Sequence, residues 1–72
     1  MHLSQTQKEF LTVLDDGGAT GLLFYQISAR MTHGLKQPTI DKVLQSGFAE
    51  RLPGGLRGSY RITEAGRSAL SN

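Results

Sequence analysis

Hydrophobic and polar positions along the chain follow helical spacing in some segments and strand spacing in others, and glycines separate these segments. The first helical segment begins at Ser4, because Ser4 and Gln7 have the spacing of a capping box, in which two side chains satisfy free backbone amides. Thr6 and Glu9 repeat this spacing two residues later. The glycine pair at 17–18 ends the segment. Its apolar face is formed by Leu3, Phe10, Leu11 and Leu14.

A second helix is predicted over residues 22–30, with Thr20 as its N-terminal cap. Its inner side is marked by residues one turn apart, namely Leu23, Ile27 and Met31. Residues 32–36 show no hydrophobic period and are expected to form a turn.

The third helix has a clear start at residues 37–38, because proline at the first helical position costs no hydrogen bond. Gly47 closes the helix. The buried stripe is formed by Ile40, Val43 and Leu44, and the outward side by Thr39, Asp41, Lys42 and Gln45. A helix this short depends on packing for its stability.

After Gly47 the period changes to that of strands. Residues 48–52 and 59–63 flank a glycine-rich tip at residues 53–58, which predicts a β-hairpin. In the second strand Tyr60 and Ile62 are expected to point inward. Thr63 then caps a last short helix that ends near Leu70.

This order of elements predicts one α+β domain over residues 1–72, a winged helix-turn-helix with three short helices, a two-stranded β-hairpin wing and a short C-terminal helix. Residues 37–42 followed by residues 47–51, together with residues 62–67, resemble bacterial winged-helix regulators of the MarR and PadR type. In this resemblance the first stretch corresponds to the recognition helix, and the last to the end of the wing. The resemblance implies a DNA-binding transcriptional regulator of a bacterium, plasmid or phage.

The chain departs from those regulators at three points. Residues 40–47 are about one helical turn shorter than their recognition helix, and no Asp precedes the arginine of the wing. The extra terminal helices through which they dimerise and bind small effectors have no counterpart here, so no small-molecule effector is expected.

Composition excludes several kinds of chemistry. With 72 residues and no cysteine, the chain has no disulfide, thiolate metal site or cysteine nucleophile. His2 and His33 are unpaired, so neither a metal nor a cofactor is expected. Residues 17–21 lack the Lys-Ser/Thr of a phosphate-binding loop, and no nucleophile has a base beside it, so we expect no enzyme.

The longest apolar run, residues 22–25, is too short for a bilayer, and the N-terminus lacks the regions of a secretory signal. A cytoplasmic protein is therefore expected. Eight basic and six acidic residues give a net charge of +2, which permits contact with nucleic acid without requiring it.

The polar face of the third helix and the wing supply the candidate DNA contacts. A helix fits the major groove of B-DNA, where glutamine, threonine and lysine reach base edges or phosphates, while arginines on a ribbon reach the backbone or the minor groove. The predicted DNA-binding residues are Lys36, Gln37, Thr39, Lys42, Gln45, Arg51, Arg57 and Arg61. The expected partner is double-stranded DNA.

Each of these features also has a plainer interpretation. Any surface helix is polar outside, Asp41 would repel phosphate, and Arg51 or Arg61 can pair with Glu50 across the strands. The alternative is a winged-helix module that binds a protein partner instead of DNA, through Leu35 with Leu56 or the face around Phe24. A homodimer is also open, because Phe10, Leu11 and Leu14 with Leu70 would serve equally as an interface or as core. Tyr25 is expected on the outer side of the second helix, and Phe48 and Tyr60 in the core.

Overall fold

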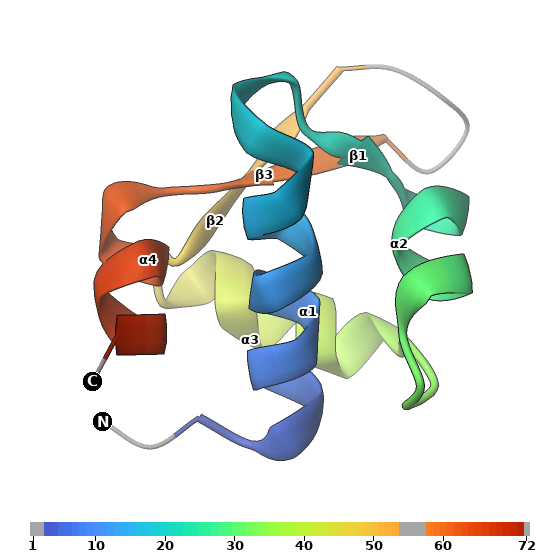
Figure 1. The fold of residues 1–72 in the computed structure, drawn as a ribbon, viewed down its shortest axis with the longest axis horizontal. Coiled ribbons are helices and arrows are strands. Elements are labelled where there is room, and N and C mark those ends of the chain that lie inside the picture. The colour runs from blue at the N-terminus through green and yellow to red at the C-terminus, as the bar shows by residue number, and fades with distance from the viewer. Residues whose placement is uncertain (1–2, 54–57, 72) are drawn as a thin grey trace.

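Four α-helices and a three-stranded antiparallel sheet form the described part of the chain, residues 3–53 and 58–71 of a computed structural model (Figure 1). The protein is therefore α+β, as predicted. In chain order the elements are α1 (Gln5–Gly17), a 3-10 turn (Gly18–Thr20), β1 (Leu22–Leu23), α2 (Phe24–Arg30), α3 (Gln37–Gln45), β2 (Ala49–Leu52), β3 (Ser59–Ile62) and α4 (Glu64–Ser71).

The start of α1 confirms the predicted capping box. The Ser4 hydroxyl accepts a hydrogen bond from the Gln7 amide at 3.1 Å, and Gln7 Oε1 accepts one from the Ser4 amide at 2.9 Å. Both amides would otherwise lack a partner at the helix start. One face of α1 is buried, through Phe10, Leu11, Val13 and Leu14.

Three of these α1 residues lie inside the core and are not available as a dimer surface. Phe10, Leu11 and Leu14 are each 0% exposed. Leu70 of α4 is half-buried and packs against the same core. In a chain of 72 residues few apolar side chains are to spare, and α1 supplies the largest share of the core.

The structure corrects the predicted start of the second helix. Leu22–Leu23 forms the short strand β1, and α2 begins only at Phe24. Leu22 pairs with Tyr60 in the sheet. Gly21 approaches the same strand with φ at +77°, and a Cβ there would lie 2.8 Å from the Tyr60 carbonyl oxygen. Pairing with the hairpin therefore makes this apolar run a strand.

The prediction that Thr20 caps α2 is therefore wrong. The Thr20 hydroxyl donates to the Gly17 carbonyl at 3.3 Å, within the 3-10 turn. The amide of Leu23, the N-cap residue, donates instead to Oε1 of Gln26 at 2.9 Å. Gln26, at the third helical position, thus forms one of the two hydrogen bonds of a capping box.

Strand β3 is the centre of the sheet, with the strand order β1-β3-β2. The hairpin pairs Ala49 with Ile62 and Arg51 with Tyr60. Tyr60 and Ile62 are buried, as predicted, at 3% and 5% exposure. The Tyr60 ring meets Phe10 of α1 edge to face, with ring centroids 6.2 Å apart, which fastens the sheet to the helix.

Thr63 joins the end of α3 to the start of α4. Its hydroxyl accepts a hydrogen bond from the Gly66 amide at 3.2 Å, which confirms it as the helix cap, and donates to the Gly47 carbonyl at 2.6 Å. Its amide donates to the Phe48 carbonyl at 3.0 Å. Thr63 therefore holds the start of α4 against residues 47–48, which connect α3 to the hairpin.

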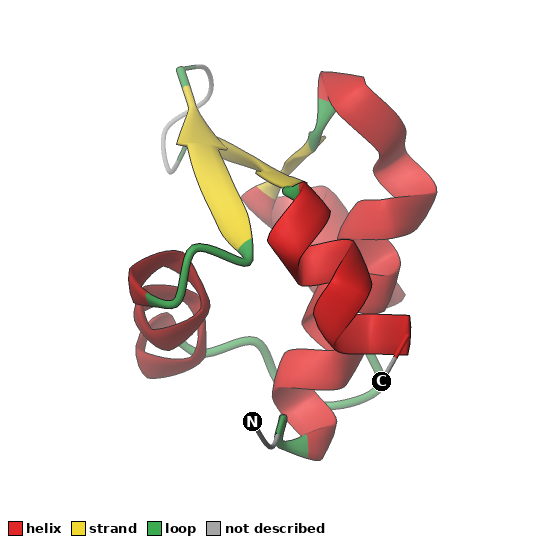
Figure 2. Cartoon of the chain, turned by 90° about the vertical axis from the view of Figure 1, so that its left-hand side faces the viewer, coloured by secondary structure: helices red, strands yellow, loops and turns green. Residues whose placement is uncertain are grey.

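In the side view, α3 and the β2–β3 hairpin lie on one side of the molecule and α1 on the other (Figure 2). Helix α4 packs against α1. The surface predicted to contact DNA thus lies on the side opposite the helix that supplies the largest share of the core. Among the described residues, every helix falls short of the length and apolar character that a bilayer span requires.

Candidate nucleic-acid interface

Helix α3 begins as predicted, with Pro38 in its first turn and the Lys36 carbonyl accepting from the Thr39 amide at 3.1 Å. Ile40 and Val43 are buried at 0% and 1% exposure, which turns the opposite side of the helix outward. Three members of the predicted outward set, Asp41, Lys42 and Gln45, are exposed, while Thr39 is half-buried at the margin of this face. Gln37, at the helix start, is exposed as well.

Asp41 lies on the same exposed face and is bonded to a predicted base-reading residue. Gln37 Nε2 donates to Asp41 Oδ1 at 3.0 Å, one helical turn away. The bond leaves Gln37 one amide hydrogen and its carbonyl oxygen for another partner. The acidic group therefore orients Gln37, yet it places a negative charge on the face predicted to meet DNA.

The two described arginines of the hairpin differ in what they contact. Arg51 is exposed on β2 and its side chain crosses Gly58, where a Cβ would lie 2.8 Å from Arg51 Nε. Arg61 on β3 pairs with Glu50 across the strands, one of the alternatives that the sequence left open. Arg57, the third predicted arginine, lies outside the described residues, as does Leu56.

These contacts divide the charges of the candidate surface. Within residues 3–53 and 58–71, Lys36, Lys42 and Arg51 are exposed and have no ion-pair partner. The ion pairs in that part of the chain are Arg61 with Glu50 and Arg67 with Asp15, and His33 Nδ1 lies 3.2 Å from Glu9 Oε1. Three cations on α3, its N-cap and β2 are thus available to phosphate.

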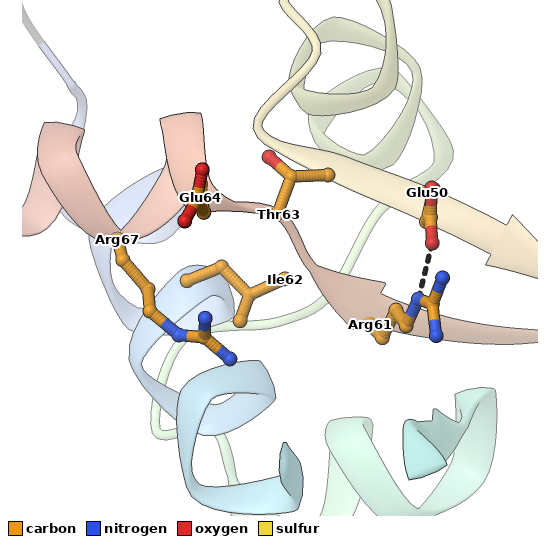
Figure 3. A pocket seen from close by; sticks show the side chains of 6 residues that line it. All are labelled: Glu50, Arg61, Ile62, Thr63, Glu64 and Arg67. Carbon is orange, nitrogen blue, oxygen red and sulfur yellow. Dashed lines mark hydrogen bonds and ion pairs between the residues drawn. The ribbon is translucent and has the colours of Figure 1, made fainter. Parts of the chain in front are cut away.

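A hollow of about 290 Å³ lies where the outer face of the hairpin meets α4 (Figure 3). It is lined by Glu50, Arg61, Ile62, Thr63, Glu64 and Arg67. Figure 3 shows Arg61 directed at Glu50, while Arg67 extends toward the end of α1, where its Nε lies 3.2 Å from Asp15 Oδ1. Because each arginine already has a carboxylate, this hollow is a poor anion site. No three His, Asp or Glu side chains in the described ranges come close enough to hold a metal ion.

A second hollow, of about 390 Å³, lies between α1 and the turn that precedes α3. It is lined by Gln5, Lys8, Glu9, Thr12, Val13, Arg30 and His33. Within this hollow, hydrogen bonds to Glu9 join α1 to the turn. The hydroxyl of Thr32 lies 2.5 Å from Glu9 Oε2, and the His33 amide donates to Oε1 at 2.8 Å.

Sequence reasoning assigned no site role to Glu9 because its partners lie 23 and 24 positions further along the chain. The hydrogen bond from the Thr32 hydroxyl, followed by that from the His33 amide, lowers the pKa of Glu9 to about 2. His33 Nδ1 lies 3.2 Å from Oε1 as a third contact. The carboxylate is therefore ionised at neutral pH and held against the turn.

The apolar side chains predicted to bind a protein partner are partly buried against the core where the structure describes them. Leu35 and Phe24 are half-buried and pack against the buried cluster. Tyr25, on α2, is the exposed large hydrophobic residue of the described chain, at 68%. A single exposed aromatic is ordinary for a folded protein and does not make an apolar patch.

Comparisons with protein-family models, with characterised proteins and with solved structures found no match to this chain. The resemblance to MarR- and PadR-type regulators therefore stays a prediction.

Proposed function

We propose that the chain is a winged helix-turn-helix domain that binds double-stranded DNA and regulates transcription in a bacterium, plasmid or phage. Helix α3 would lie in the major groove, and the β2–β3 hairpin would contact the adjacent backbone or minor groove. The observation that carries this proposal is a set of three cations, Lys36, Lys42 and Arg51, on the side of the molecule where α3 and the hairpin lie together; none of them has an ion-pair partner among the described residues.

Each exposed residue of α3 then has a role that suits its chemistry. Gln37, at the helix start, is placed to reach a base edge, with its side chain oriented by Asp41. Gln45 offers a second amide on the same face. Lys36 and Lys42 would neutralise phosphates on either side of the groove. Regulation would follow from occlusion of a promoter or from recruitment of a partner.

The hairpin contributes through Arg51 and through Arg57 of the tip. Arg51 is held over Gly58 at the base of the tip, and it pairs with no carboxylate of residues 3–53 and 58–71. Arg61 contributes less than the sequence predicted, because Glu50 neutralises its charge. Four phosphate contacts, from Lys36, Lys42, Arg51 and Arg57, are therefore expected.

A protein-binding module remains the second candidate, and Asp41 is the observation that favours it. A carboxylate within the groove-facing side would repel phosphate, unless it accepts a hydrogen bond from the amino group of a cytosine. The two functions differ in how binding depends on salt, since only contacts with DNA release condensed counterions in proportion to the phosphates neutralised.

The test is a fluorescence-anisotropy titration of random-sequence duplex DNA at several salt concentrations. Four phosphate contacts predict a slope of log K against log salt of about −3.6. The double variant Lys42→Gln/Arg51→Gln should bind more weakly, with a slope smaller by about 1.8.

Lys8→Gln is the matched control, because it removes one exposed cation from α1, a helix outside the predicted DNA-binding set. Its slope should equal that of the wild type. No binding at low salt by protein shown to be folded by circular dichroism would reject the DNA-binding function and favour the protein-binding module.

A further inference from the structure

The turn between α2 and α3, residues 31–36, is attached to α1 by one carboxylate. Both oxygens of Glu9 are engaged: Oε2 by the Thr32 hydroxyl at 2.5 Å, and Oε1 by the His33 amide at 2.8 Å, with His33 Nδ1 at 3.2 Å. The Glu9 side chain is 21% exposed, and its partners Thr32 and His33 lie on the surface. Hydrogen bonds to a charged group are about twice as strong as those between neutral groups.

Apolar anchors flank these polar contacts. Met31, at the start of the turn, is buried at 9% exposure, and Leu35, near its end, packs half-buried against the core. Thr32, His33 and Gly34 between them are exposed. The Glu9 carboxylate thus fixes the part of the turn that the core does not hold, shortly before the Lys36 N-cap of α3.

We propose that Glu9 is a positioning residue for DNA binding, which holds the turn so that Lys36 and Gln37 meet DNA in a fixed orientation. This inference rests on the proposed function of α3. Glu9 itself lies on α1 and would contact no phosphate or base. It acts through Thr32 and His33 on the residues that begin α3.

The proposal makes a prediction that simple electrostatics contradicts. Removal of a negative charge from a DNA-binding protein reduces its repulsion from the phosphates, so by electrostatics alone the affinity for DNA should rise. If Glu9 instead keeps the turn in its binding-competent form, its loss lowers the competent fraction, and the apparent affinity falls by the same factor. The direction of the change therefore separates the two roles.

The experiment compares Glu9→Gln with Asp16→Asn in the anisotropy titration with duplex DNA. Both variants remove one carboxylate from α1, but Asp16 is exposed, and within the described ranges no hydrogen bond or ion pair joins it to the turn. We expect Glu9→Gln to bind about fivefold more weakly, if roughly a fifth of the molecules stay competent, and to keep the wild-type salt slope. Asp16→Asn should bind as tightly as the wild type or slightly more tightly.

A readout without DNA tests the attachment itself. Hydrogen exchange of the His33 backbone amide should be faster in Glu9→Gln than in the wild type, because that amide loses a charged acceptor. Thr32→Val removes the hydroxyl donor and leaves α1 unchanged, so it serves if Glu9→Gln does not fold. It should weaken DNA binding in the same direction, and the double variant should lose less than the sum of both.

The outcomes separate this inference from the proposed function. A wild-type protein that does not bind DNA overturns the proposed function, and the positioning role falls with it, whatever the exchange of the His33 amide shows. A wild type that binds, with Glu9→Gln binding as tightly as Asp16→Asn, overturns the positioning role alone. Thr32→Val with wild-type affinity does the same where Glu9→Gln cannot be folded.

Discussion

Gly66 of α4 lies so close to Phe48 that the helix and the chain entering β2 are in backbone contact. A Cβ at position 66 would overlap the carbonyl oxygen of Phe48 and lie 2.7 Å from Ile62 Cγ1. The Phe48 carbonyl also accepts a hydrogen bond from the Thr63 amide, and this bond holds the carbonyl in place. The absence of a side chain at residue 66 is therefore a condition for α4 to dock where the hairpin begins.

Gly66→Ala should consequently destabilise the protein, although alanine is the better helix former. Overpacking of a close contact costs about 1–3 kcal/mol, which exceeds the gain of about 1 kcal/mol in helix propensity. The midpoint of urea unfolding measures the difference. Gly34→Ala is the matched control, because no atom lies within 4 Å of a Cβ there, and its stability should change by less than about 0.5 kcal/mol. A Gly66→Ala protein as stable as the wild type would show that α4 can move away from Phe48.

Thr63→Val should lower the free energy of unfolding by about 1–2 kcal/mol, because the hydroxyl both caps α4 and binds the Gly47 carbonyl. Valine keeps the shape of threonine and removes only these two hydrogen bonds. Thr63→Ser retains the hydroxyl and should recover most of the loss. If serine and valine destabilise equally, packing of the methyl group and not hydrogen bonding is responsible.

Asp41→Asn should strengthen binding to random duplex DNA by about fivefold, the effect of removing roughly 1 kcal/mol of repulsion at a distance of about 4 Å in water. Asparagine retains an oxygen that accepts the bond from Gln37 Nε2, so the orientation of Gln37 is kept. Anisotropy titrations of wild type and variant measure the change, with Asp16→Asn as the control for net charge. Weaker binding of Asp41→Asn would mean that the carboxylate itself accepts a hydrogen bond from DNA.

Glu9 makes the stability of the fold sensitive to acid. Its pKa in the folded protein is about 2, below the ordinary 4.5, so the unfolded chain takes up the proton first as pH falls. The stability that this group contributes is complete above its ordinary pKa and is lost as pH falls toward its folded pKa.

Urea unfolding from about pH 5 to about pH 2.5 should therefore show a smaller loss of stability in Glu9→Gln than in the wild type. Other carboxylates titrate in both proteins, so the difference between the two curves is the quantity of interest. Asp16→Asn should follow the wild-type curve. Parallel curves for Glu9→Gln and wild type would contradict the role of the turn contacts in lowering the pKa.

Local signals in the sequence predicted the starts of α1, α3 and α4, although the local cap Thr20 was wrong for α2. The capping pair Ser4 and Gln7, Pro38 at the start of α3, and Thr63 before α4 all act within three or four residues, and all are confirmed. The burial of Tyr60 and Ile62 followed from alternation along one strand. Such features depend on neighbours in the chain and need no knowledge of the fold.

Features that depend on distant residues escaped sequence reasoning. The apolar pair Leu22–Leu23 fits a helix as well as a strand, and only its pairing with β3 decides for the strand. The partners of Glu9 in the turn lie 23 and 24 positions further along the chain, and no pattern in the neighbouring sequence predicts this contact. In the candidate interface, periodicity predicted which residues of α3 are exposed, but the pairing of Arg61 with Glu50 required the register of the hairpin.

The contrast between the two tyrosines gives the protein a pair of built-in optical reporters. The chain has no tryptophan, so its ultraviolet emission comes from Tyr60, which is 3% exposed, and Tyr25, which is 68% exposed. A soluble quencher such as iodide would reach the ring on α2 in the native state and the ring in the core only after global unfolding. Quenching therefore splits the emission of an unlabelled sample into one signal from α2 and one from the packed interior.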